Sequence, residues 1–284
     1  MATVIRDVTE MQRTAERLRN SGRRLGVVPT MGFLHEGHLA LIRTARERSD
    51  AVITTIFVNP TQFGPGEDFE RYPRDFDRDR SLASSAGTEY IFAPETSAIY
   101  PEDYCTYINS ERLTTVLEGK SRPGHFRGVT TIVAKLFNIT RPHVAVFGQK
   151  DAQQVVVVRQ LIRDLNFDIE LVVVPVVRER DGLAMSSRNA YLTEEQRRQA
   201  PVLFHSLKVA EQRMREGESS CARLINEMKE LITARSSVVI DYVSIADAAS
   251  LEELTSIDNR TSILVSLAAR FGKTRLIDNV AVTL

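Results

Sequence analysis

The first segment of the chain places its apolar residues at the spacing of a helix. Charged residues occupy the positions between them, so residues 8–20 are expected to form a helix with one buried face. The apolar positions lie three and four residues apart: Val8, Met11, Ala15 and Leu18.

Beyond this helix, apolar strand candidates alternate with helical segments up to about residue 177. The strand candidates are residues 24–29, 51–58, 90–92, 144–147 and 169–177, and the helical segments are about 36–48, 74–86, 128–140 and 151–165. This alternation predicts right-handed βαβ crossovers, and therefore an α/β fold with a parallel sheet covered by helices on both faces. In such sheets, ligands bind beyond the carboxyl ends of the strands.

The pattern changes after about residue 177. Residues 193–234 are mostly helical in character, and three strand candidates follow at 237–245, 261–269 and 275–282. Short segments join these strands, which favours a smaller α+β domain with an antiparallel sheet. We therefore expect two domains, residues 1–177 and residues 178–284.

Composition and charge exclude several classes of protein. Lysine plus arginine equals aspartate plus glutamate, 37 against 37, so the surface as a whole predicts no nucleic-acid partner. The N-terminal segment lacks the apolar stretch of a signal peptide and no run of 18 apolar residues exists, which predicts a cytoplasmic protein without a membrane partner. Without a secretion signal, the glycosylation patterns at 138–140 and 259–261 are chance matches.

The two cysteines, Cys105 and Cys221, lie far apart in the sequence. Two such thiols make neither a disulfide framework nor a zinc site, and they fit a reducing compartment.

A histidine pair stands at the start of the helix that follows the first apolar strand. His35 and His38 are three residues apart and are expected to share a helix face. Unpaired backbone N–H groups and the positive end of the helix dipole lie there, and Gly32 and Gly37 allow a ligand close to the backbone. The segment predicts a phosphate site, in which histidine could donate hydrogen bonds to the leaving pyrophosphate.

This pair has two other interpretations. A histidine at a helix start can simply be a cap or a surface residue. A metalloprotease site requires histidines four residues apart with glutamate directly after the first, and the spacing here is three.

Two further segments carry groups suited to phosphate. The loop Met185-Ser186-Ser187-Arg188-Asn189 offers two hydroxyls and a guanidinium, although such a loop is also an ordinary surface turn. In Phe147-Gly148-Gln149-Lys150-Asp151, the lysine could reach phosphate and the aspartate could accept from a ribose hydroxyl. The alternative for this second segment is a helix capped by Asp151 beside a solvated lysine.

Residues 118–128 form a basic, glycine-bearing segment. Gly119-Lys120-Ser121 suggests a P-loop, but that motif needs glycine at position 114, where Thr114 stands. We interpret the segment as a mobile, positively charged loop near an anionic substrate, with a plain surface loop as the alternative.

Taken in order, these segments resemble the pantothenate synthetase family over nearly all 284 residues. The matching segments are residues 28–32 with 35–38, 57–63, 72–74, 117–119 with 121–128, 150–151 with 153–154, 181–189 and 275–279. The histidine pair and the serine loop alone would indicate only the wider HIGH-type nucleotidyltransferase group.

The resemblance implies a Rossmann-type domain with a smaller C-terminal domain, a homodimer, and an ATP-dependent ligase reaction in two halves. Pantoate carboxylate attacks the α-phosphate of ATP to give pantoyl adenylate and pyrophosphate. The amine of β-alanine then attacks the acyl carbon, which releases AMP and pantothenate.

The resemblance also implies roles for particular residues. ATP would contact Met31, Gly32, Phe33, Leu34, His35, Glu36, Gly37, His38, Gly148, Gln149, Lys150, Asp151, Val177, Met185, Ser186, Ser187 and Arg188. The catalytic residues would be His38 as proton donor, His35 and Lys150. Gln62 and Gln154 would bind pantoate, Gln62 also β-alanine, and Mg²⁺ would be held mainly by ATP phosphates with Asp79 as a helper.

Three positions depart from the family pattern. Gln149 stands where the family usually has glutamate, Ala152 where it has an aromatic residue, and Thr61 where methionine is common. These departures bear on local packing and substrate affinity rather than on the reaction type.

Two other functions remain as alternatives. One is a nucleotidyltransferase with a stable nucleotidyl product, such as a phosphopantetheine adenylyltransferase, against which Gln62 and Gln154 favour a small polar acid as substrate. The other is a nucleotide-binding module without turnover, which the intact set of phosphate-binding side chains disfavours.

Overall fold

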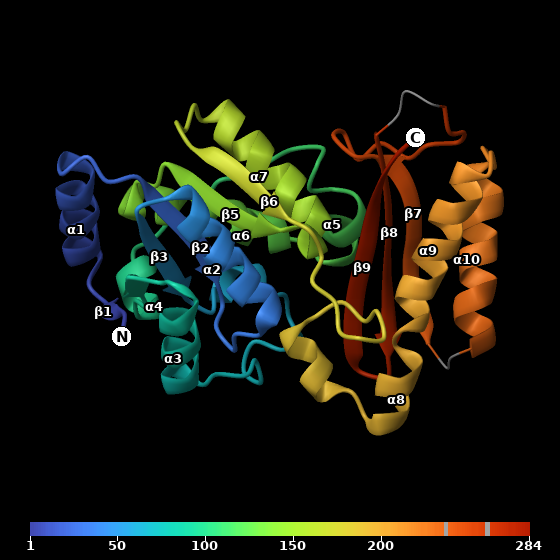
Figure 1. Cartoon of the computed structure of the whole chain (residues 1–284), viewed down its shortest axis with the longest axis horizontal. Coiled ribbons are helices and arrows are strands. Elements are labelled where there is room, and N and C mark those ends of the chain that lie inside the picture. Colours follow the sequence, from blue (N-terminus) through green and yellow to red (C-terminus); the bar gives the residue numbers. More distant parts are fainter. Residues whose placement is uncertain (236–237, 259–261) are drawn as a thin grey trace. The chain divides into compact units, whose positions relative to one another are not determined.

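Two separate sheets organise the chain in the computed structural model, which describes residues 1–235, 238–258 and 262–284 (Figure 1). The residues divide into two compact units. The first consists of Met1–Gln149 and Val157–Pro175, and the second of Lys150–Val156 and Val176–Leu284.

The first unit contains a six-stranded parallel sheet in the order β1-β4-β3-β2-β5-β6. Its strands are β1 (Thr3–Ile5), β2 (Leu25–Thr30), β3 (Ala51–Ile56), β4 (Tyr90–Phe92), β5 (Val144–Gly148) and β6 (Glu170–Val174). The predicted parallel sheet is therefore confirmed. The prediction missed β1, and its last strand extended too far, because Pro175 follows β6 directly and has no N–H for a ladder.

The helices between these strands cover both faces of the sheet. They are α1 (Val8–Asn20), α2 (Glu36–Arg48), α3 (Phe76–Ala86), α4 (Thr96–Ile99), α5 (Leu117–Ser121), α6 (His125–Thr140) and α7 (Ala152–Asp164), whose first turn belongs to the second unit. The helix α2 contacts β2, β3, β5 and β6, whereas α1 and α6 contact each other and β2. Because the chain runs one way from β2 to β3 and the other way from β5 to β6, right-handed crossovers place α2 and α7 on opposite faces.

Local sequence accounts for where the helices begin. Asp7 caps α1, its Oδ1 accepting from the N–H of Glu10 at 2.8 Å, and the predicted buried positions Met11, Ala15 and Leu18 face the core. Asp75 caps α3 in the same way, and Gly87, at φ +112°, ends it.

The order of the strands places a switch point between β2 and β5. At such a point, ligands bind in the crevice beyond the carboxyl ends of the strands. The segment that leaves β2 leads to the histidine pair, and the one that leaves β5 leads to Lys150.

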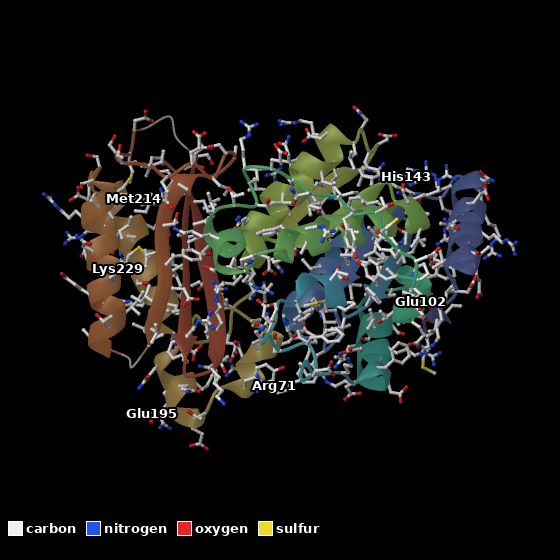
Figure 2. All side chains as sticks on the ribbon, turned by 180° about the vertical axis from the view of Figure 1, so that it is seen from behind. Arg71, Glu102, His143, Glu195, Met214 and Lys229 are labelled. Atoms are coloured by element: carbon white, nitrogen blue, oxygen red, sulfur yellow. The ribbon has the colours of Figure 1, made fainter. Side chains whose placement is uncertain are left out.

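The second unit has a three-stranded antiparallel sheet in the order β7-β8-β9, with β7 (Val239–Asp247), β8 (Ser262–Phe271) and β9 (Thr274–Thr283). Its helices are α8 (Glu194–Gln199), α9 (Val202–Arg215) and α10 (Cys221–Arg235). Met214 on α9 is buried in the core of this unit, while Lys229 on α10 is exposed (Figure 2). The predicted α+β architecture is confirmed. The expected strand starts at Ser237 and Thr261, like the pattern at 259–261, lie outside the described residues.

None of the described helices is both long and apolar enough to cross a membrane.

Candidate active site

The two histidines form a reciprocal cap at the start of α2. His35 is the N-cap residue, in extended conformation, and its Nδ1 accepts from the N–H of Gly37 at 3.2 Å. The Nδ1 of His38 accepts from the N–H of His35 at 3.3 Å, and the ring centroids lie 4.1 Å apart. Since Nδ1 is the acceptor in both rings, each neutral imidazole carries its proton on Nε2. The interpretation of these histidines as a helix cap is therefore correct, and the two rings lie side by side as expected.

A buried carboxylate holds the turn that leads to this cap. Gly32 has φ +84°, and an added Cβ would lie 3.0 Å from Oδ2 of Asp79. Oδ2 of Asp79 accepts from the N–H of Phe33 and Oδ1 from the N–H of Leu34, both at 2.7 Å. The residue is 1% exposed; burial raises its pKa, and the two N–H donors oppose that shift.

These contacts define a task for Asp79 that sequence reasoning did not foresee. The carboxylate ties α3 to the turn between Gly32 and the histidines. Both of its oxygens already accept backbone N–H groups, which argues against a direct bond to Mg²⁺.

The amide of Gln62 is oriented by neighbours of the same unit. Asn59 Nδ2 donates to Gln62 Oε1 at 3.1 Å and to the carbonyl of Gly128 at 3.1 Å, and Gln62 Nε2 donates to Met31 Sδ at 3.0 Å. Gln62 thus lies beside one predicted ATP contact, Met31. Its Nε2 is identified as the donor end by the partner on Oε1.

Asn59 is itself fixed by two hydroxyls. The hydroxyls of Thr61 and Tyr100 both donate to Asn59 Oδ1 at 2.9 Å. Burial raises the pKa of Tyr100 to about 12, so the phenol stays protonated and can donate. The departure at Thr61 therefore supplies a hydrogen bond that methionine could not make.

The basic segment 118–128 is largely helical, within α5 and α6, rather than a loop. Arg122 forms a paired contact with both carboxylate oxygens of Glu67 at 2.7 Å, and the Arg122 and Glu67 side chains are 15% and 24% exposed. Burial acts to raise the pKa of Glu67, but Arg122 outweighs it and the net pKa is lowered. The predicted loop is therefore wrong for most of this segment, whereas its mobility stays a prediction. The sequence does not reveal that Glu67 would pair with this arginine.

His125, the first residue of α6, is half-buried beside this ion pair. Its Nδ1 donates to the carbonyl of Gln62 at 2.8 Å, and Arg122 Nη1 donates to its Nε2 at 3.1 Å. Burial, with the charge of Arg122, lowers the pKa of His125 to about 4, so the ring is neutral at pH 7. The Nδ1–H group thereby attaches the Gln62 turn to α6, whereas the contact from Arg122 to Nε2 depends on the neutral ring.

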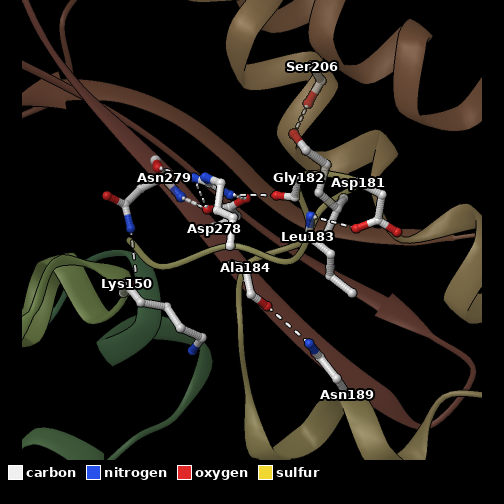
Figure 3. A network of polar contacts seen from close by, with 11 residues as sticks. Lys150, Asp181, Gly182, Leu183, Ala184, Asn189, Ser206, Asp278 and Asn279 are labelled. Carbon is white, nitrogen blue, oxygen red and sulfur yellow. Dashed lines mark hydrogen bonds and ion pairs between the residues drawn. The ribbon is translucent and has the colours of Figure 1, made fainter. Parts of the chain in front are cut away.

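In the second unit, Lys150 lies in a short 3-10 turn that spans Gln149–Asp151 and follows β5. Its Nζ is 3.7 Å from Oδ1 of Asp151, and its side chain is 22% exposed. The backbone carbonyl of Lys150 accepts a hydrogen bond from Asn279 Nδ2 at 3.0 Å (Figure 3).

The serine loop, Met185–Asn189, follows a small hairpin in the same unit. The Met185 N–H donates to the Val177 carbonyl at 2.9 Å, and Glu179 N–H donates to the Leu183 carbonyl at 2.8 Å. Ser186 then caps the 3-10 helix Ser187–Tyr191, its Oγ accepting from the N–H of Arg188 at 3.3 Å. Val177 and Met185, predicted to contact ATP, are therefore neighbours.

The structure groups the predicted site residues by unit. Met31 to His38 and Gln62 belong to the first unit, and so do Gly148 and Gln149. Lys150, Asp151, Gln154, Val177 and Met185 to Arg188 belong to the second. The joint action of the histidines with Lys150, and of Gln62 with Gln154, stays a prediction.

Several residues that organise these groups were missed by sequence reasoning. No role was given to Asn59, Tyr100, Arg178, Asp278 or Asn279. Asn59 is 1% exposed, so a buried amide beside the predicted pantoate ligand is a signal of its role, but one visible only in three dimensions.

The family model for pantoate-beta-alanine ligase matches residues 3–281. The pantothenate synthetase of Acetivibrio thermocellus is 52% identical over 279 residues, which cover 98% of this chain and 99% of that protein. That of Thermotoga petrophila is 51% identical over 276 residues, covering 97% and 98%.

Solved structures agree. The pantothenate synthetase of Thermus thermophilus has a TM-score of 0.94 at 43% identity, covering 99% of this chain and 100% of that one. The Francisella tularensis ligase, solved with "Beta-gamma ATP and Beta-alanine", has a TM-score of 0.80 at 31% identity, covering 99% and 98%. By sequence over its full length and by fold, the chain belongs to the pantoate–β-alanine ligase, or pantothenate synthetase, family.

Proposed function

We propose that this chain condenses pantoate with β-alanine in two steps at one site, through a pantoyl adenylate intermediate. Pantoate–β-alanine ligase activity follows from membership of the family. The order of steps and the roles of individual residues are our assignment. It is supported by the ATP analogue and β-alanine bound in the Francisella relative.

The reciprocal histidine cap is the observation that carries this proposal. Because each Nδ1 accepts a backbone N–H, a neutral ring carries its proton on Nε2, close to the positive end of α2. In adenylation, the pantoate carboxylate attacks the α-phosphate and negative charge builds on the departing pyrophosphate. His38, assisted by His35 and the charge of Lys150, donates to those oxygens, which stabilises the transition state.

The remaining ATP contacts position the nucleotide. Met31 to His38 would follow the phosphates, Gly148 to Asp151 the ribose and phosphates, and Val177 the adenine. Met185 to Arg188 would close on the triphosphate. In-line attack on phosphorus needs such positioning more than covalent participation by the protein.

Gln62 and Gln154 would bind pantoate. The contact from Asn59 to Oε1 leaves Nε2 of Gln62 as the donor end, beside Met31, and such a donor suits a carboxylate or hydroxyl of a small acid. In the second step Gln62 would also contact β-alanine, whose amine attacks the acyl carbon of the adenylate and displaces AMP.

Mg²⁺ would be held by oxygens of the ATP phosphates. Its charge would lower the repulsion between these phosphates and the incoming pantoate carboxylate. The surroundings of Asp79 do not fit a direct ligand, as described above, so Asp79 is assigned to the turn rather than to the metal. A homodimer remains a prediction from the family.

The test separates the two steps. With ATP and pantoate alone, the enzyme should release pyrophosphate in a single turnover per site. AMP and pantothenate should appear only when β-alanine is added. Release of AMP without pantoate, or a stable dinucleotide product, would instead indicate hydrolysis or the adenylyltransferase alternative.

A further inference from the structure

Two adjacent residues of β9, Asp278 and Asn279, are buried polar side chains that the proposed reaction does not use. They are 3% and 2% exposed. Successive side chains of a strand point to opposite faces, so neighbouring residues can reach two different segments. Both segments carry groups assigned above to ATP.

Asn279 reaches the turn that bears Lys150. Its Nδ2 donates to the carbonyl of Lys150 at 3.0 Å, across 129 residues of sequence (Figure 3). The acceptor belongs to the backbone, so the contact fixes the point from which the Lys150 side chain starts and leaves its ammonium group available to a phosphate.

Asp278 reaches the base of the hairpin that carries the serine loop. Its two carboxylate oxygens accept from Arg178 Nη1 and Nη2 at 2.6 and 2.9 Å. The same guanidinium donates to the carbonyl of Gly182 at 3.0 Å and lies 3.7 Å from the ring centroid of Phe204. The Arg178 side chain is 15% exposed, so these contacts are largely shielded from solvent. Its guanidinium connects both ends of the hairpin turn.

Close packing gives this arrangement little freedom. A Cβ on Gly182, at φ +94°, would lie 2.4 Å from Phe204 Cδ1. Downstream, Asn189 Nδ2 donates to Glu179 Oε1 at 3.0 Å and to the Ala184 carbonyl at 3.1 Å, which ties the far end of the serine loop back to the hairpin.

We propose that Asp278 and Asn279 are positioning residues, which hold the Lys150 turn and the segment 178–188 in a fixed relation on one strand. Neither would touch ATP. This inference rests on the proposed assignment of Lys150 and the serine loop to the phosphates. Its physical basis is that phosphoryl chemistry is sensitive to placement, so a shift of about 1 Å in a positioning group can cost about a hundredfold in rate.

The first test is Asn279→Ala, which removes the donor to Lys150. Pantoate-dependent pyrophosphate release should slow by about tenfold or more, within the range that a misplaced group costs. Ser266→Ala is the control. Ser266 pairs with Asn279 in the strand register and is 5% exposed, and its Oγ has no hydrogen-bond partner among the described residues. It should keep its wild-type rate.

A double variant distinguishes positioning from general destabilisation. If Asn279 acts through Lys150, Lys150→Ala should nearly abolish adenylation, and adding Asn279→Ala to it should change the rate no further. Asn279→Ala should also spare the reaction of preformed pantoyl adenylate with β-alanine to the same extent as Lys150→Ala.

Two results would overturn the inference in distinguishable ways. If Asn279→Ala stays within about twofold of wild type while Lys150→Ala is inactive, Lys150 needs no such support and only the positioning role fails. If Lys150→Ala is itself active, the assignment of Lys150 in the proposed function is wrong, and the inference falls with it.

Arg178→Lys tests the other arm while keeping the positive charge beside Asp278. A lysine cannot reproduce the paired contact, so the KM for ATP should rise by about fivefold or more, with the KM for pantoate within about twofold. Equal increases in both KM values, or none, would contradict a role for Asp278 and Arg178 in placing the serine loop.

Discussion

At the scale of single residues, the site depends on which atom of each polar side chain is already occupied. The Nδ1 atoms of His35 and His38 are acceptors within the cap, so a neutral ring carries its proton on Nε2, the atom to which we assign the chemistry. In the same way, Oε1 of Gln62 accepts from Asn59 and leaves Nε2 as the donor end. The role of each such atom is thus specified by the hydrogen bond that another atom of the same side chain already makes.

His38→Ala should slow adenylation by about 10²–10³-fold with little change in ATP affinity, the typical loss for one donor that acts on transition-state charge. Single-turnover pyrophosphate release measures this step. Preformed pantoyl adenylate and β-alanine supply the control, because pyrophosphate has already left and the second step should stay close to the wild-type rate. An equal loss in both steps would mean that His38 serves only to cap α2.

Asp79→Asn should destabilise the protein. The new side-chain NH₂ group would face the backbone N–H of either Phe33 or Leu34, which would then have no acceptor. A buried N–H left without an acceptor costs about 1–3 kcal/mol in the free energy of unfolding, which denaturant titration measures. The KM for ATP should also rise as the turn before the histidines shifts. The Mg²⁺ concentration for half-maximal activity should be unchanged; a large increase would instead identify Asp79 as a metal ligand.

At the scale of elements, close approach between backbones fixes the turn that bears Gln62, the proposed pantoate ligand. The helix α6 contacts the short turn Pro60–Gln62 at Gly128. A Cβ there would lie 2.4 Å from the Thr61 carbonyl oxygen and 2.6 Å from the Gln62 N. Glycine is needed because no side chain fits between helix and turn.

Gly128→Ala should therefore displace Gln62. We expect a loss of about 1–3 kcal/mol in the free energy of unfolding from overpacking, and a KM for pantoate that rises more than the KM for ATP. Gly124→Ala is the matched control. Its φ of +83° makes the substitution strained, but its Cβ meets no atom within 4 Å, so stability should fall without a selective effect on pantoate.

Periodicity predicted the elements well where they are long. The helices expected at 8–20 and about 36–48 correspond to α1 and α2, and the alternation of strands and helices gave the parallel sheet. The three-residue strand β1 is too short to show a period, and α6 begins three residues before the predicted start, after Gly124 with its positive φ.

The contacts that position the site could not be predicted in this way. Asp79 lies 46 residues from Phe33 in the sequence, and Asn279 lies 129 from Lys150. Neither spacing nor propensity encodes such pairings, because they depend on which faces of distant elements meet after folding. The chemistry-bearing side chains stand in local motifs, whereas their supports do not.

At the scale of the whole molecule, acid should weaken the fold through His125. Its folded pKa of about 4 lies below the value of 6.5 for an unperturbed histidine, so between these values the unfolded chain binds a proton that the folded chain does not. The free energy of unfolding should then fall as pH drops from about 6.5 to 4, by up to about 3 kcal/mol from this group.

Denaturant titrations at several pH values measure that slope. His125→Gln can still donate to the Gln62 carbonyl and accept from Arg122 but cannot take up a proton. It should be less stable than wild type at pH 7 and lose less on acidification. Parallel pH profiles for the two proteins would remove His125 as the source of acid sensitivity.

The chain passes between its two units after Gln149, Val156 and Pro175, so neither unit is one continuous stretch of sequence. A hybrid gene that joins two relatives at residue 177 would take Lys150 from one parent and Asn279 from the other. A hybrid in which residues 150–156 travel together with 176–284 inherits both from the same parent. We expect the second kind to unfold at a higher temperature. In recombination between members of this family, the seven residues 150–156 should therefore be exchanged together with the C-terminal part, 176–284.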